Sequence, residues 1–186
     1  MTNHIDLGSV LRQTLAAHLY SNLVTRPTGR AVRSEIERQL DSVPTAERAL
    51  AIIDFSQVSM IDFSCADEVI AKLVMNRSAH PTLESYFVFR GMNDDHWDAI
   101  ETVLERHGLA LVVEREGGGV ELVGVLADRE RRAWEGVKRR GRTLPADLAG
   151  ELGEPEDDIG ETLDRMWKRR LIMRFGDAYM PVGELA

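Results

Sequence analysis

The chain has 186 residues, enough for one large domain or two small ones that each bury a core. Its composition, 44% hydrophobic and 29% charged, is that of a soluble globular protein and excludes wholesale disorder. A net charge of −8 argues against a protein whose whole surface binds nucleic acid, although it allows one local basic patch.

Up to residue 125, short apolar runs typical of strands alternate with amphipathic stretches typical of helices. The first predicted element is a helix that begins near Asp6, with Leu7, Val10, Leu11 and Leu15 on one side. Strands are predicted over residues 49–55, 86–89, 110–113 and 120–123. Because Gly117, Gly118 and Gly119 separate the last two runs, we expect a hairpin at the sheet edge.

Three further helices are predicted between these strands, each with its apolar residues at helical spacing. The residues on their buried faces are Val32, Ile36 and Leu40, then Ala66, Val69, Ile70, Leu73 and Val74, then Trp97, Ile100, Val103 and Leu104. The predicted N-terminal caps are Thr28, Ser64, and Asn93 or Asp94. On the second of these helices, Asp67, Glu68 and Lys72 are expected to face outward. Residues 1–125 therefore predict an α/β domain in which helices cover a small sheet.

From residue 126 onward the pattern changes to three helices followed by a hairpin. Helices are predicted over residues 130–138, over a short stretch that ends at Leu152, and over residues 155–170. Thr143 is the expected cap of the second helix, with Pro145 in its first turn. Two strands, 171–175 and 178–182, are joined by Gly176-Asp177, a two-residue turn signal. Residues 126–186 thus predict a second, α+β domain.

No stretch of the sequence predicts a membrane segment. The longest apolar runs, Ala49 to Ile53 and Leu109 to Val113, have five residues, against the ~20 that a spanning helix needs. The residues Met1 to Asp6 lack both the basic start and the apolar stretch of a secretory signal. We therefore expect a cytoplasmic protein.

Motifs for enzyme chemistry are absent from the sequence. It contains no G-x-x-x-x-G-K-[ST], G-x-G-x-x-G, G-x-S-x-G or H-E-x-x-H motif. None of the five histidines has another three or four residues away, and the single cysteine, Cys65, has no partner for a disulfide or a zinc site. We expect no metal, no cofactor and no catalytic residues, and hence a protein that is not an enzyme.

The most informative stretch is Asp54 to Leu73, DFSQVSMIDFSCADEVIAKL, in which a strand ends and Asp62-Phe63-Ser64-Cys65 leads into a helix. It resembles the STAS domain of bacterial anti-sigma-factor antagonists, and in particular STAS-like variants in which Ser-x-Ala-Asp-Glu opens the helix. Here that run is Ser64-Cys65-Ala66-Asp67-Glu68. The stretch Thr25 to Arg30, TRPTGR, is similar to those variants too, and the resemblance covers roughly residues 20 to 115.

The resemblance implies a protein partner, either a histidine-kinase-type ATPase or a sigma or anti-sigma factor. It also implies that the loop and the start of the helix form the docking surface, here Met60, Ile61, Asp62, Phe63, Ser64 and Cys65. Antagonists of the family accept phosphate on a serine directly after the aspartate, where this chain has Phe63. Ser64 is the nearest candidate phosphoacceptor, and its alternative role is to cap the helix.

Residues 143–183 resemble a winged helix-turn-helix domain, which implies a partner that is either DNA or protein. Acidic residues fill the N-terminal half of its third helix, the half that enters the major groove in a DNA reader. The candidate nucleic-acid or partner contacts are Arg139, Arg140, Arg142, Arg165, Lys168, Arg169, Arg170 and Arg174. The sequence thus predicts a bacterial regulatory protein that binds a protein partner through the STAS-like domain, with the winged helix as a second interaction module. The alternative is a transcription regulator that binds DNA through the winged helix.

Overall fold

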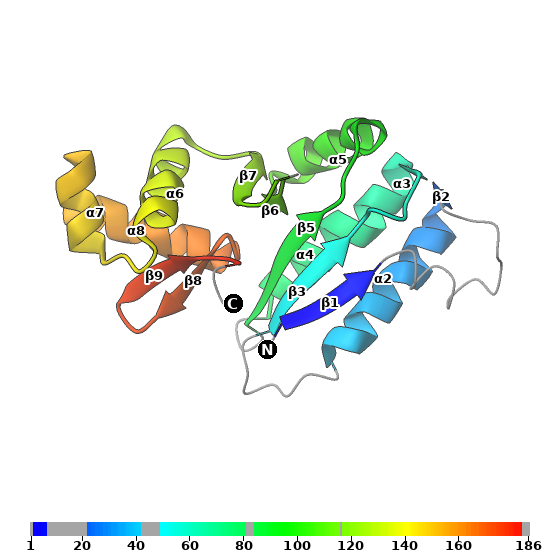
Figure 1. Ribbon diagram of the computed structural model, residues 1–186, viewed down its shortest axis with the longest axis horizontal. Helices are drawn as coiled ribbons and strands as arrows, with labels where there is room; N and C mark the ends of the chain where they lie inside the picture. Colours follow the sequence, from blue (N-terminus) through cyan, green and yellow to red (C-terminus); the bar gives the residue numbers. More distant parts are fainter. Residues whose placement is uncertain (1, 7–21, 42–48, 81–83, 116, 184–186) are drawn as a thin grey trace. The chain divides into compact units, whose positions relative to one another are not determined.

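The structure is a computed structural model that describes residues 2–6, 22–41, 49–80, 84–115 and 117–183 (Figure 1). The chain divides into two compact units, Met1–Val125 and Leu126–Ala186. The early helix expected for Leu7, Val10, Leu11 and Leu15 lies outside the described residues. Within the described residues, no helix is long and apolar enough to cross a membrane.

A five-stranded sheet forms the centre of the first unit, in the order β1-β3-β5-β6-β7. Its strands are β1 (Thr2–Asp6), β3 (Ala49–Asp54), β5 (Ser85–Arg90), β6 (Ala110–Glu114) and β7 (Val120–Gly124). The first four are parallel, and β7 runs antiparallel to β6, so the predicted hairpin at the sheet edge is confirmed. The sequence analysis missed β1, which pairs with β3 in the register Ile5↔Ile53. Its composition, TNHID, has too few apolar residues to predict a strand locally.

Among its described residues, the first unit has the helices α2 (Arg26–Asp41), α3 (Phe63–Ala66), the π-helical segment η1 (Asp67–Lys72), α4 (Leu73–Ser78) and α5 (Asp94–His107). The segments α3, η1 and α4 follow one another without a break. Because successive parallel strands are neighbours and crossovers are right-handed, the helices lie on one face of the sheet. One core cluster joins alternate strand residues, such as Ile53 and Phe89, to Val32, Ile36 and Val69 of the helices. The three predicted apolar stripes are thereby confirmed, with Trp97 partly buried at the margin.

Two of the three predicted caps in this unit are wrong. Thr28 lies inside the first turn of α2, which begins at Arg26. Asp62 is the N-cap of α3, and its side chain accepts the N–H of Cys65, whereas Ser64 lies within the helix. Asn93 precedes α5 as expected, and its own N–H donates to His96 Nδ1 at 3.2 Å. The aspartate takes the capping role because its charged carboxylate can accept several N–H groups at once.

The second unit contains α6 (Asp128–Arg140), α7 (Pro145–Leu152) and α8 (Glu156–Lys168), then the antiparallel strands β8 (Ile172–Phe175) and β9 (Ala178–Pro181). This order of elements was predicted. Thr143 is not the cap of α7, because Leu144 holds that position. Instead, the backbone of Thr143 exchanges two hydrogen bonds with Tyr179, at 2.9 and 2.8 Å. The core of the unit includes Trp134, Leu148, Ile159, Leu163 and Met166, all buried.

We predict that Val69→Asp destabilises the first unit by several kcal/mol, because the side chain of Val69 is fully buried in the apolar core, where a carboxylate would lose its hydration. Chemical denaturation of the full chain measures the change. Gln57→Asp, which adds the same charge at an exposed loop position, is the control and should unfold like the parent. A Val69→Asp variant with the parental midpoint would contradict the packing of η1 on the sheet.

Candidate functional site

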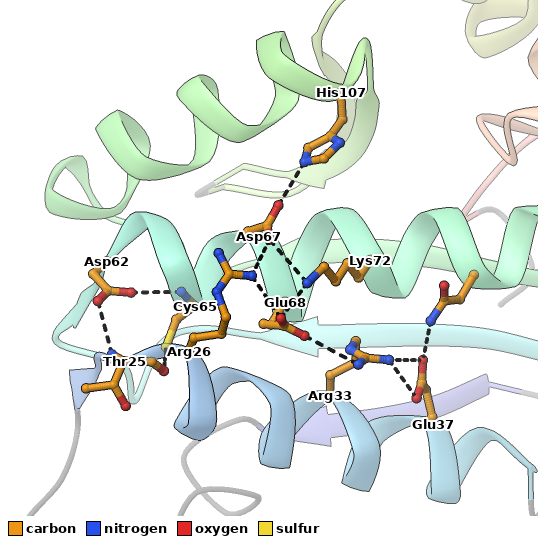
Figure 2. A network of polar contacts seen from close by, with 11 residues as sticks. Thr25, Arg26, Arg33, Glu37, Asp62, Cys65, Asp67, Glu68, Lys72 and His107 are labelled. Atoms are coloured by element: carbon orange, nitrogen blue, oxygen red, sulfur yellow. Dashed lines mark hydrogen bonds and ion pairs between the residues drawn. The ribbon is translucent and has the colours of Figure 1, made fainter.

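The two stretches that carry the family resemblance, Thr25–Arg30 and Asp62–Glu68, lie against each other in the structure (Figure 2). The closest approach is at Gly29, where an added Cβ would lie 2.9 Å from the Cα of Cys65. Only a residue without a side chain allows α2 and α3 to pack so closely. The start of α2 and the start of α3 therefore form one continuous site.

The carboxylate of Asp62 holds both helix starts. Its Oδ2 accepts the N–H of Thr25 at 3.0 Å, and its Oδ1 accepts the N–H of Cys65 at 2.8 Å. The hydroxyl of Ser64 also donates to Oδ1, at 2.9 Å. Burial acts to raise the pKa of Asp62, but the two backbone N–H bonds outweigh burial and lower that pKa. A carboxylate that is ionised at neutral pH thus fixes the loop to both helices.

Thr25 and Cys65 complete this junction. Thr25 adopts φ 76°, a left-handed conformation that costs a non-glycine residue on the order of 1 kcal/mol. Its carbonyl accepts the N–H of Gly29 at 3.1 Å and the Sγ–H of Cys65 at 2.9 Å. Burial, together with the charge of Asp62, raises the pKa of Cys65 to about 12. The thiol is therefore protonated at neutral pH and acts as a packed donor.

Asp67 and Glu68 are buried, with 6% and 0% of their surface exposed, so the expectation that they face outward was wrong. Their segment, η1, contacts α2 as well as α5, which cover its flanks. A single amphipathic stripe cannot indicate that a helix is covered on more than one side. A π-helical segment is also rare and often marks a functional site, which directs attention to these two carboxylates.

Four side chains from three helices surround this carboxylate pair (Figure 2). Arg26 Nη1 lies 2.8 Å from Asp67 Oδ2 and 3.0 Å from Glu68 Oε1. Lys72 Nζ lies 2.5 Å from Glu68 Oε1 and 3.4 Å from Asp67 Oδ2. The third helix contributes His107, whose Nε2 lies 2.8 Å from Asp67 Oδ1. The network thus connects the start of α2, η1 and the end of α5.

Arg33 extends the network along α2. Its Nη2 lies 3.3 Å from Glu68 Oε2, and its Nη1 lies 3.0 Å from Glu37 Oε1. Glu37 in turn accepts the amide of Asn76 at 3.1 Å. The Arg33–Glu37 pair has the i,i+4 spacing that a sequence can reveal, but the pairs between Arg26 or Arg33 and η1 join residues 35 to 42 positions apart. Sequence reasoning therefore missed Arg26, Arg33 and His107.

Both carboxylates are held in their charged forms. Burial acts to raise the pKa of Asp67, but hydrogen bonds from Arg26 and His107 outweigh burial and lower it to about 2. Burial also acts to raise the pKa of Glu68, but the hydrogen bonds from Lys72 and Arg26 outweigh burial and lower that pKa. Neither group can donate a proton near neutral pH, so the arrangement is a structural lock between helices.

The six residues of the predicted docking loop differ in how far they are buried. Ile61 and Cys65 are buried and cannot contact a partner directly. Met60 is 47% exposed, the largest exposure among the large apolar side chains of the described part of the chain. Phe63 packs partly on the core, and the guanidinium of Arg106 lies 5.4 Å from its ring centroid. The sequence had left open whether Ser64 caps the helix or accepts phosphate. A phosphate on Ser64 would lie beside the charged carboxylate of Asp62.

Four of the eight basic residues predicted as contacts in the second unit are paired with carboxylates. Arg139 and Arg140 bind Glu151, Arg169 binds the buried Glu130 at 2.8 Å, and Arg174 binds Asp164 at 3.0 Å. Arg170 is buried. Among the described residues of this unit, the exposed side chains of Arg142, Arg165 and Lys168 make no ion pair. The structure thus gives no continuous basic face from Arg139 through Arg174.

A hollow of about 470 Å³ opens where β5 and β6 end and α5 begins. Its lining includes Asn93, Trp97, Glu114 and Arg115. The guanidinium of Arg115 lies 5.2 Å from the ring centroid of Trp97, so these two side chains already form a cation–π contact with each other. Sequence reasoning did not single out this hollow, because Asn93 and Arg115 are brought together only by the parallel pairing of β5 with β6.

No protein-family model and no curated protein sequence matches this chain. Within the described residues, no group of three or more His, Cys, Asp or Glu side chains could hold a metal ion.

We predict that Asp67→Asn lowers the free energy of unfolding at pH 7 by at least about 2 kcal/mol. This is the free energy that corresponds to a lowering of the Asp67 pKa from ~3.9 in the unfolded chain to about 2 in the folded one. Because the folded-state pKa is the lower one, this stabilisation is complete above about pH 4 and disappears as the pH falls to about 2. Urea denaturation at several pH values should show the two proteins converge at low pH. Asp98→Asn, on an exposed part of α5, is the control. A difference that stays constant from pH 7 to pH 2 would contradict the role of Asp67.

Proposed function

We propose that this protein is a non-enzymatic bacterial regulatory protein that binds a protein partner through its first unit. The docking surface is the exposed side of the junction between α2 and α3, formed by Thr25, Arg30, Met60, Phe63 and Ser64, and is called here the helix-start surface. The observation that carries the proposal is the exposure of Met60 beside a junction whose backbone is fixed by Asp62.

A fixed junction is suited to recognition, because a surface that is already ordered loses little conformational freedom when a partner binds. Thr25 is held by hydrogen bonds at both its N–H and its carbonyl. Methionine is an adaptable apolar contact, and Met60 projects from the two-residue strand β4 (Met60–Ile61), which pairs with β2 (Asn22–Leu23). The flexible contact therefore sits on a rigid support.

Exposed charges of both signs lie on the helices near Met60. Arg30 is exposed on α2, whereas the carboxylates of Asp62, Asp67 and Glu68 are turned to partners within the unit. Asp94 and Asp95 are exposed at the start of α5, which contacts β4, so the charge around Met60 does not select the partner. By resemblance to STAS-like domains, the partner is a histidine-kinase-type ATPase or a sigma or anti-sigma factor.

The second unit, with its three helices and a hairpin, is proposed to be a winged helix that acts as a second interaction module. Its α8 carries Glu156, Asp157 and Glu161 at exposed positions in its N-terminal half. Carboxylates there repel the phosphates of a duplex. The pairing of Arg139, Arg140, Arg169 and Arg174 with carboxylates also favours a protein over DNA as the ligand of this unit.

We predict that Met60→Ser weakens binding of the partner at least ~10-fold without lowering stability, because truncation of an exposed anchor removes contact area only. The partner is captured from a lysate of the native host on the immobilised full chain, identified, purified and titrated. Leu144→Ser is the control, since Leu144 is 43% exposed and lies in the second unit. If Leu144→Ser abolishes binding and Met60→Ser does not, the helix-start surface is not the docking site.

We predict that the full chain binds duplex DNA weakly and without sequence preference. The exposed side chains of Arg142, Arg165 and Lys168, which make no ion pair, would give an affinity that falls about 40-fold between 50 and 200 mM salt, from a slope of about −0.9 per neutralised phosphate. Affinities for random and host-promoter duplexes at the two salt concentrations test this. A promoter-specific complex with a Kd near ~10 nM at physiological salt would instead establish the transcription-regulator alternative.

A further inference from the structure

His96 lies in the first turn of α5, and none of its surface is exposed. Its Nδ1 accepts the N–H of Asn93 at 3.2 Å, and its Nε2 lies 3.1 Å from the carbonyl oxygen of Val58. An imidazole nitrogen that accepts an N–H carries no proton itself, so the proton of the neutral ring is on Nε2 and is donated to Val58. A buried side chain of α5 thereby holds the loop between β3 and β4.

This loop leads directly to Met60, the exposed anchor of the helix-start surface. Val58 precedes Met60 by two residues, and its N–H donates to the carbonyl of Phe55 at 2.8 Å, which closes a turn. The ring of Phe55 packs on the ring of His96, with the centroids 5.8 Å apart. The helix α5 also contacts β4, the strand that begins at Met60. His96 thus contacts both ends of the turn that precedes the anchor.

The buried ring of His96 is neutral. Burial lowers its pKa, because the loss of hydration outweighs the groups that favour the charged form. From the loop between β3 and β4 those groups are the backbone of Val58 and Ser59, and the ring of Phe55 also faces the imidazole; none of them titrates. From α5 itself, the carboxylate of Asp95 acts on the ring and raises its pKa. Enclosure of the ring is therefore what keeps it uncharged.

A proton on His96 is incompatible with the closed site. The protonated ring would carry an N–H on Nδ1, which would then face the N–H of Asn93 across 3.2 Å. Two donors cannot bond to each other, and the charge would lie out of water. The protonated ring therefore has to leave its site, and its bond to Val58 is broken with it.

We infer that His96 is a positioning residue for the helix-start surface, and that its protonation in mild acid releases the turn that supports Met60. The open form takes up the proton first as the pH falls below about 6.5, because the folded-state pKa is the lower one. The closed site is thus fully stable above that pH and weakens below it. The effect on partner binding rests on the proposed function, whereas the effect on the turn does not.

Hydrogen exchange of the full chain between pH 7.5 and 5.5, corrected for the intrinsic exchange rate at each pH, tests the inference without a partner. Protection of residues 55–61 and 91–97 should fall together, by up to ~10-fold at pH 5.5, the limit for one proton and an ordinary pKa of about 6.5. Protection of α8, in the second unit, should not change over this range.

Two substitutions separate the role of the proton from the role of the ring. His96→Gln supplies an acceptor and a donor that do not titrate, and a glutamine at this third helical position can accept the N–H of the capping residue. Its turn should be protected as in the wild type at pH 7.5 and should stay so at pH 5.5. His96→Asn retains an acceptor for Asn93 but is too short to reach Val58, so protection of residues 55–61 should fall at least ~5-fold at every pH. His80→Gln, at an exposed histidine, is the control and should follow the wild type.

The inference is overturned if protection of residues 55–61 in the wild type does not depend on pH, or if His96→Asn leaves that protection unchanged. If His96→Asn does not fold, the wild-type and His96→Gln profiles decide, and identical profiles overturn it. Affinity for the captured partner is then measured over the same pH range, and it should fall for the wild type and not for His96→Gln. If exchange behaves as expected but affinity does not, the proposed docking surface is wrong and the role of His96 in the turn stands.

Discussion

The compensated charge of Asp67 and Glu68 is the constraint on which the helical layer of the first unit depends. Both carboxylates lie on a helical run between α2 and α5, and each contacts at least two cationic or histidine side chains. A buried ion pair often contributes little net stability, but a buried carboxylate without its partner costs several kcal/mol. If α2 moved along its axis by one turn, Arg26 and Arg33 would both leave η1. The network therefore fixes the relative positions of the helices more than it increases stability.

This fixed register determines the geometry of the helix-start surface. Arg26 binds the carboxylate pair, and the preceding residue, Thr25, is bound by Asp62 and Cys65. The left-handed conformation of Thr25 persists because these contacts on both sides specify it. A partner that docks beside Met60 thus contacts a surface whose shape is set by charges buried below it. Strain and buried charge in one small region are typical of sites under functional constraint.

The sequence predicted the elements whose signals are local. The runs at 49–55 and 110–123, the stripe of Val69, and the Gly176-Asp177 turn all match the structure because each depends on neighbouring residues alone. The prediction failed where distant residues decide the outcome. Asp67 and Glu68 are buried because Arg26 and His107, about 40 positions away, can pair with them. The strand β1 forms because it pairs with β3, whereas its own sequence has no pattern that predicts a strand.

The difference between local signals and distant contacts also explains why the arginines of the second unit do not form a basic surface. Residues 139–142 and 165–170 form basic clusters in the sequence, since their neighbours along the chain include few carboxylates. In the fold, Glu151 approaches Arg139 and Arg140 from α7, and Glu130 of α6 binds Arg169 across 39 positions. Exposed pairs of this kind are worth only ~0–1 kcal/mol each, so a ligand could in principle replace them. The pair with Glu130 differs, because removal of Arg169 would leave a buried carboxylate behind. Arg169 is therefore committed to the fold, and a basic run in the sequence is not by itself a basic surface.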